Sequence, residues 1–119
     1  MIEVLPESEG NVLGVRAGGV LSGSDYEEVL IPRLETIMGQ GKARFLFEMG
    51  PGFQGWMLDA LWADATFGFR RRHDFEKVAI VGATTWIELG ARVGSWIMTG
   101  EVRTFAPEQL GEAWRWIKA

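Results

Sequence analysis

The motif with the most specific chemistry is a glycine-rich segment near the middle of the chain. Gly50-Pro51-Gly52-Phe53-Gln54-Gly55 matches the G-x-G-x-x-G pattern, which holds a dinucleotide pyrophosphate when it links a strand to a helix. Pyrophosphate binding needs free backbone N–H groups, but Pro51 has none and Phe53 is bulky. The chain also contains 16 glycines, so chance matches are easy. We therefore interpret the segment as a structural loop and not as a nucleotide site.

Side chains for catalysis or metal binding are sparse. The 119 residues include no cysteine and a single histidine, His73, which argues against thiolate chemistry, cysteine-ligated metals and a histidine-rich metal site. Asp59 and Asp64 lie about 140° apart around a helix, so their carboxylates do not converge as an acid–base pair. We predict that the chain is not an enzyme and that it uses no metal or cofactor.

Tryptophan is the residue type that stands out, with six copies in 119 residues. Trp62 and Trp114 lie on apolar stripes at helical spacing, which predicts that both belong to the core. A helix expected at 85–97 has more apolar surface than one core-facing stripe requires, because its charge is limited to Glu88 and Arg92. Tryptophan suits an apolar ligand because it combines a large apolar face with one N–H donor. The predicted ligand-binding residues are Phe53, Trp56, Trp86, Trp96 and Met98.

Short apolar runs alternate with helical periodicity along the chain, which is the pattern of an α/β domain. Strands are expected at 2–5, 12–17, 45–47, 78–81 and 102–105, and helices at 24–38, 58–69, 85–97 and 107–117. The short link between the first two strands predicts an antiparallel hairpin. The intervening helices predict parallel pairing of the later strands by right-handed crossovers, with helices on both faces. The expected order is ββαβαβαβα, with a mostly parallel five-stranded sheet and an antiparallel edge strand.

Two local signals shape the first expected helix. Ser24 and Glu27 have the spacing of a capping box, which predicts that the helix begins at Ser24. Pro32 falls inside the helix and is expected to kink or split it, because proline lacks the N–H that the helix ladder needs.

Charge and hydropathy limit the partners and the location of the protein. Sixteen acidic against twelve basic side chains leave a formal charge of −4, which argues against nonspecific binding to nucleic acid. The acidic amino terminus is the reverse of a secretory signal, and no uncharged stretch approaches the ~18 residues that cross a bilayer. We expect a single domain over residues 1–119 in the cytoplasm. Arg70-Arg71-Arg72 would form a solvated helix end or attract an anionic surface.

Several longer segments together resemble one family. The chain is similar over nearly all of its length to the SpoIIAA-like family, bacterial proteins with a STAS-type fold. The segments that carry the resemblance are Tyr26–Glu35, Phe53–Trp56, Ala60–Trp62, His73–Gly82 and Gly100–Arg103. The resemblance implies a small regulatory or ligand-binding module without catalysis, related in fold to STAS domains and more distantly to CRAL-TRIO lipid-binding domains.

One feature of related proteins has no counterpart in this chain. Anti-sigma-factor antagonists of this fold carry a phosphorylatable serine just after the central strand. Here that position reads Phe47-Glu48-Met49-Gly50-Pro51, and the next hydroxyl side chain is Thr66. The resemblance therefore does not extend to a phosphoserine switch.

Two hypotheses from different classes follow from these patterns. The first is a noncatalytic module that binds an apolar or lipid-like ligand, with the aromatic-rich third helix as a movable cover that also contacts a membrane surface. The second is a STAS-type protein–protein regulatory module that docks a partner, or a second copy of the chain, through the same aromatic surface.

Overall fold

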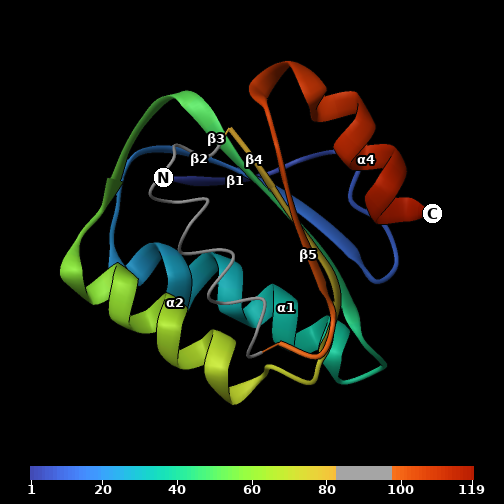
Figure 1. Ribbon diagram of the computed structural model, residues 1–119. Coiled ribbons are helices and arrows are strands. Elements are labelled where there is room, and N and C mark those ends of the chain that lie inside the picture. Colours follow the sequence, from blue (N-terminus) through green and yellow to red (C-terminus); the bar gives the residue numbers. More distant parts are fainter. Residues whose placement is uncertain (83–97) are drawn as a thin grey trace.

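The structure is a computed structural model that describes residues 1–82 and 98–119 (Figure 1). Its strands form one sheet in the order β1-β2-β3-β4-β5. β1 pairs antiparallel with β2, and each later neighbouring pair is parallel. From β1 to β5 the bounds are Ile2–Val4, Val12–Leu21, Ala43–Trp56, Phe75–Val81 and Glu101–Phe105. The predicted α/β class and the mostly parallel sheet with its antiparallel edge strand are confirmed.

Helices lie on both faces of the sheet, as the sequence predicts (Figure 1). The π-helix η1 (Asp25–Leu30), α1 (Ile31–Met38) and α2 (Leu58–Arg70) pack on one face; the 3-10 helix η2 (Pro107–Gln109) and α4 (Leu110–Lys118) lie on the other. Alternation along β3 separates the two cores, since Phe45 and Phe47 face α1 and α2 whereas Leu46 faces α4. The helix expected at 85–97, with Trp86 and Trp96, lies outside the described residues.

The first helix is split near Pro32, as expected, but its start differs from the prediction. Ser24 has helical dihedral angles and makes no side-chain capping bond, so the capping box at Ser24 is wrong. The carboxylate of Asp25 instead accepts hydrogen bonds from the backbone N–H of Ser22 at 2.9 Å and from its hydroxyl at 3.2 Å. The π-helix η1 ends directly before α1, and Pro32 is the second residue of α1, so the change of helix type falls where proline removes an N–H from the helical ladder.

The glycine-rich segment is part of a strand and not a loop. β3 continues through it to Trp56, and the register pairs Gly19 with Phe53 and Leu21 with Trp56 of β3. Bulges interrupt this register, and the φ of +118° at Gly55 is a conformation that favours glycine. The expected loop is therefore wrong, because the extension of β2 gives these residues a hydrogen-bonding partner. Phe53 and Gly55 of the segment pair with β2, whereas Gly50, Pro51 and Gly52 lie in the bulge between Met49 and Phe53.

Helix α2 turns its bulky apolar stripe away from the core. We call this stripe the outer face of α2; it consists of Leu58, Trp62, Ala65 and Phe69. Trp62 is 76% exposed, so its predicted place in the core is wrong. The helix packs through smaller or inward residues instead, with Ala60 and Phe67 buried. This choice of face leaves space between α2 and the sheet.

Candidate functional site

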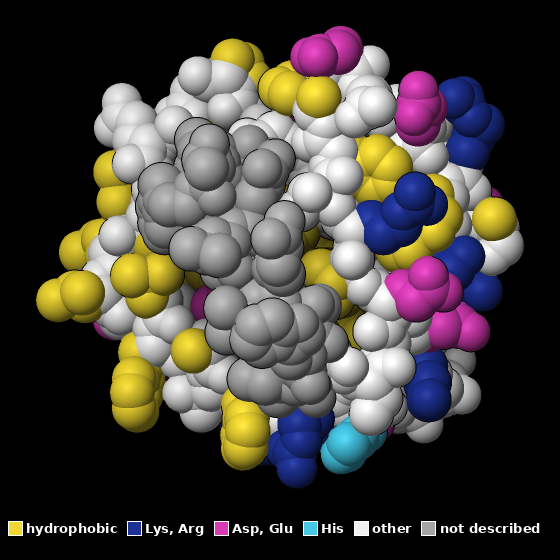
Figure 2. Space-filling view, in the orientation of Figure 1, with side chains coloured by type: hydrophobic (Ala, Val, Ile, Leu, Met, Phe, Trp, Pro, Cys, Tyr) yellow, Lys and Arg dark blue, Asp and Glu magenta, His cyan; other side chains and the backbone are white. Residues whose placement is uncertain are grey.

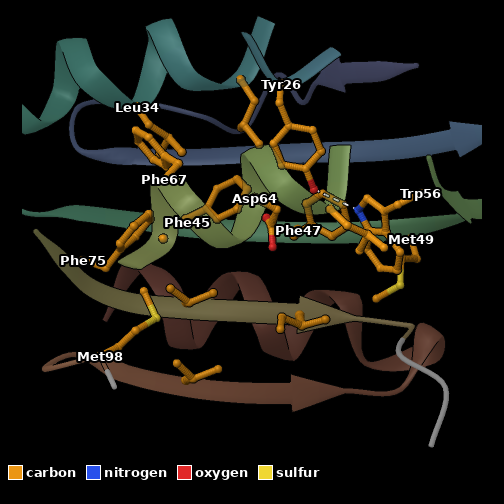
Figure 3. Close-up of a pocket in the computed structure, with 16 residues that line it drawn as sticks. Tyr26, Leu34, Phe45, Phe47, Met49, Trp56, Asp64, Phe67, Phe75 and Met98 are labelled. Atoms are coloured by element: carbon orange, nitrogen blue, oxygen red, sulfur yellow. Dashed lines mark hydrogen bonds between the residues drawn. The ribbon is translucent and has the colours of Figure 1, made fainter. Parts of the chain in front are cut away.

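A cavity of about 360 Å³ lies between the sheet and the helices η1, α1 and α2. Aromatic and aliphatic side chains form most of its wall (Figure 3). The described residues that line it are Tyr26, Leu30, Leu34, Phe45, Phe47, Met49, Trp56, Leu61, Asp64, Phe67, Gly68, Phe75, Val78, Ile80, Met98 and Val102. A mostly apolar cavity with a few polar groups is the usual form of a small-molecule site.

Two aromatic residues form the polar corner of this wall. The indole Nε1 of Trp56 donates a hydrogen bond of 2.9 Å to the hydroxyl oxygen of Tyr26 (Figure 3). Trp56 also stacks on Phe47, with ring centroids 6.4 Å apart and an interplanar angle of 17°. Tyr26 is only 2% exposed, and its burial raises the pKa of its hydroxyl far above the usual value. The hydroxyl is therefore a neutral hydrogen-bonding group at physiological pH.

Asp64 brings a carboxylate into the same apolar space. Figure 3 shows it pointing from α2 into the cavity, between the rings of Phe45 and Phe67 on one side and Tyr26 and Trp56 on the other. The residue is exposed and lines the cavity, and desolvation by the surrounding protein raises the pKa of its carboxyl group. A hydrogen-bonding interaction with the Tyr26 hydroxyl lowers that pKa and so opposes part of the desolvation.

The comparison with protein families shows to which family the chain belongs. The family model of the SpoIIAA-like proteins matches residues 12–118. The chain belongs to the SpoIIAA-like family. Its fold also resembles the crystal structure of an uncharacterised DUF3478-family protein with a SpoIIAA-like fold from Shewanella loihica PV-4. The two are 28% identical, with a TM-score of 0.77 over 98% of this chain and 93% of the other. No curated protein matches this chain.

The family resemblance stated from sequence is thus confirmed. A SpoIIAA-like fold supports a small regulatory module, and this coarser statement of function holds for the chain. In the described residues, no helix is long and apolar enough to cross a membrane. The same part of the chain contains no group of three or more histidine, cysteine or acidic side chains that could hold a metal ion.

The predicted ligand-binding residues of this SpoIIAA-like chain have different outcomes. Trp56 and Met98 line the cavity. Phe53 is not among its lining residues but supports it, because its ring meets the Trp56 ring edge to face with centroids 4.9 Å apart. Trp86 and Trp96 lie outside the described residues. The structure therefore brings Met98, from the segment that leads into β5, together with the part of the predicted site that β3 carries.

Sequence reasoning missed the polar side chains of the site. The sequence indicates Tyr26 only through the family resemblance, and Asp64 only as an acid whose carboxylate does not converge with that of Asp59. One signal was present in the sequence, since Asp64 shares its side of the helix with the small Ala60 and with Phe67. A helix that approaches a sheet through small residues can also place an acid on the inward side.

Proposed function

We propose that this SpoIIAA-like chain is a noncatalytic module that binds an apolar or amphipathic, lipid-like small molecule in the cavity. The observation that carries the proposal is the cavity itself: about 360 Å³ of mostly apolar wall with the polar groups of Tyr26, Trp56 and Asp64 on one part of it. This volume lies within the range of roughly 300–1,000 Å³ that is typical of small-molecule sites.

The chemistry of the wall explains what such a ligand would gain. Each methylene group of an alkyl chain that leaves water for this space contributes about 0.8 kcal/mol. The rings of Phe45, Phe47 and Phe75 offer flat apolar surfaces to that chain, and the thioether of Met98 offers an adaptable one. Binding therefore depends on the free volume of the cavity, and a side chain that fills the cavity should prevent it.

Gly68 is a suitable position for this test. It lines the cavity, and a Cβ built on it meets no atom within 4 Å. Gly68→Leu should therefore fill part of the cavity without a clash at its Cβ, and it replaces a residue with poor helix propensity. Thr66→Leu is the matched control, because Thr66 is an exposed residue of the same helix.

Binding would be measured by titrating the protein with the neutral dye N-phenyl-1-naphthylamine and by mass spectrometry of an organic extract of the natively purified protein. We expect dye binding or a stoichiometric lipid with the wild-type protein and with Thr66→Leu, but not with Gly68→Leu. Equal dye binding by Gly68→Leu, with its helix content unchanged, would remove the cavity as the site. Absence of both dye binding and lipid in the wild-type protein would contradict the proposed function.

The outer face of α2 favours a second role, contact with a membrane surface. Leu58 and Phe69 on this face are 85% and 58% exposed, and Figure 2 shows hydrophobic side chains along the edge where Figure 1 places α2. Basic residues follow at the end of the helix, and the guanidinium of Arg72 lies 4.5 Å from the centre of the Phe69 ring. An exposed apolar helix face with adjacent arginines is typical of helices that lie on anionic membranes.

Vesicle flotation tests this second role. We expect the wild-type protein to float with anionic vesicles of phosphatidylglycerol and phosphatidylcholine, and the variant Leu58→Gln/Trp62→Gln to remain in solution. Thr36→Gln on the exposed surface of α1 is the control. No flotation with anionic or neutral vesicles would contradict membrane contact. Self-association of the wild-type protein that the double substitution abolishes would instead assign the face to a homodimer.

A further inference from the structure

The hydrogen-bonding chain at the cavity wall has a direction that its chemistry dictates. The indole N–H of Trp56 can only donate, so the oxygen of Tyr26 is the acceptor of the 2.9 Å bond between them. The single proton of the Tyr26 hydroxyl is then available to Asp64, with which Tyr26 interacts. The chain thus runs from Trp56 through Tyr26 and ends on the carboxylate, which is an acceptor.

The carboxylate has acceptor capacity beyond this one interaction. An ionised carboxylate offers about four lone-pair positions on its two oxygens, and Tyr26 can use one of them. Among the described residues, no other side chain or backbone group forms a hydrogen bond or ion pair with Asp64. Because Asp64 is exposed and lines the cavity, the lone pairs that no described residue uses can accept a hydrogen bond from a ligand there.

The charges of the residues that line the cavity also favour a ligand whose head group donates hydrogen bonds. Of the described lining residues, Asp64 is the one that is charged in its usual state, and neither lysine nor arginine is among them. Where Asp64 is ionised, a carboxylate head group beside it would place two like charges in a poorly solvated space, which is strongly unfavourable. Because desolvation raises the pKa of Asp64, this rejection should strengthen as the pH rises, and a cationic head group should itself favour the ionised form. A head group with N–H or O–H donors would instead satisfy the exposed lone pairs.

We propose that the cavity selects amphiphiles whose head group donates hydrogen bonds, such as an ammonium or a hydroxyl group, and that Asp64 is the acceptor that rejects carboxylate head groups. This inference rests on the proposed ligand-binding function and adds the chemical class of the ligand. The alkyl chain would occupy the apolar remainder of the cavity, and Tyr26 would hold the carboxylate in place.

Three probes with the same alkyl chain test the selectivity. Decylamine, decan-1-ol and decanoate differ only in the head group. Each would compete with N-phenyl-1-naphthylamine at constant ionic strength and at pH 8, where more of Asp64 is ionised than at pH 7 because its pKa is raised. Every probe is used at a concentration below that at which it aggregates. We expect the wild-type protein to bind decylamine and decanol about tenfold or more tightly than decanoate. In Asp64→Asn the ratio of decylamine to decanoate affinity should fall by about tenfold or more, because the charge is lost. Asp59→Asn is the matched control, since Asp59 is an exposed acid of the same helix and is not among the lining residues.

The outcomes separate this inference from the function on which it rests. If the dye binds but the three probes compete equally, or if Asp64→Asn keeps the wild-type preference, the head-group inference is overturned and the cavity function stands. Decanol that binds no better than decanoate would also overturn it. If neither the dye nor any of the probes binds, the proposed function itself fails.

Discussion

Trp56 in β3 and Tyr26 in η1 are joined by a 2.9 Å hydrogen bond from the indole Nε1 to the phenol oxygen. The bond connects the end of the glycine-rich strand extension to the first helix, across one wall of the cavity. The bond therefore links β3 directly to η1 beside the cavity that both elements line. Its contribution to stability can be measured, because each partner can lose its polar group while keeping most of its ring.

A double-mutant cycle with Trp56→Phe and Tyr26→Phe should isolate the contribution of this bond. We expect a coupling energy of about 1 kcal/mol in urea unfolding, as is usual for a hydrogen bond between neutral groups. The cycle cancels other interactions of either side chain. Strictly additive effects of the two substitutions would show that the bond contributes nothing to stability.

Asp64 predicts a specific dependence of stability on pH. Its pKa is raised by desolvation, so at pH values above the ordinary aspartate pKa the folded protein holds this proton more tightly than the unfolded chain does. Stability from this group is therefore greatest at low pH and is lost as the pH rises through the folded pKa. The stability of Asp64→Asn relative to the wild-type protein should accordingly increase with pH.

Urea unfolding of both proteins from pH 4 to pH 8 would check this expectation, with Asp59→Asn as the control. Carboxylates with lowered pKa values, such as Asp25 and Glu76, act in the opposite direction, but they are common to both proteins. Their effects cancel in the difference. A difference that is flat across the range, or that falls with pH, would contradict the assigned environment of Asp64.

The two sides of α2 should respond differently to substitution. Trp62→Gln removes a large side chain that is 76% exposed, so the free energy of unfolding should change by no more than about 0.5 kcal/mol. Phe67→Ala removes a buried ring that contacts Phe75 edge to face, and should cost about 3–5 kcal/mol. Chemical unfolding of the two variants distinguishes the observed orientation from the one in which Trp62 is in the core, for which the order would be reversed.

The orientation of α2 is a part of the fold that the sequence did not predict. Hydrophobic periodicity located α2 correctly, but it cannot tell which neighbour covers a stripe, and here the bulkiest stripe is exposed. Likewise, the glycines between Gly50 and Gly55 are poor strand formers, so the sequence does not predict that β3 continues here. The continuation depends on pairing with β2. The pairing of Val20 with Gly55 depends on the second strand also continuing past its own glycines. Both misses concern tertiary partners and not local preferences.

The candidate site was predictable only in part, for a related reason. Trp56 could be named because the sequence is rich in tryptophan, and Met98 because it adjoins the apolar helix expected at 85–97. Tyr26 and Asp64 could not be named, because the side of a helix that faces a cavity cannot be identified until the packing of the helix is known. A single acid on a helix is usually solvated, and only the approach of α2 through Ala60 places this one against the cavity.

Gly14 is required by the close approach of α4 to the sheet. A Cβ at this position would overlap the Trp114 ring, reaching within 2.6 Å of its Cζ2 atom. Gly14→Ala should therefore destabilise the protein by about 1–3 kcal/mol, as expected for an overpacked core. Gly18→Ala is the matched control in the same strand, because a Cβ there meets no atom within 4 Å. Thermal unfolding would measure both, and the smaller ring-free side chain in Trp114→Leu should partly rescue Gly14→Ala if the overlap is the cause.

The carboxyl end of α4 is held by two cations that the sheet register places side by side. Arg44 of β3 and Lys77 of β4 are register partners. A terminal nitrogen of the Arg44 guanidinium donates to the main-chain oxygens of Ile117 at 3.1 Å and Ala119 at 2.7 Å. Lys77 Nζ donates to those of Trp116 and Ala119, both at 3.0 Å. Helix ends leave such oxygens without intrahelical donors, and cations there also complement the helix dipole.

Replacing Arg44 should therefore loosen the docking of α4. The Nε of Arg44 also donates to Glu76 Oε1 at 2.7 Å, and this bond holds the pKa of Glu76 below its usual range. Arg44→Gln should lower the free energy of unfolding by about 1–3 kcal/mol, speed amide exchange in the last turn of α4, and return the Glu76 pKa toward its ordinary value. Arg33→Gln, on the exposed surface of α1, should change none of these quantities. Unchanged exchange in α4 of Arg44→Gln would mean that Lys77 and the apolar contacts of Ala113 and Ile117 suffice to dock the helix.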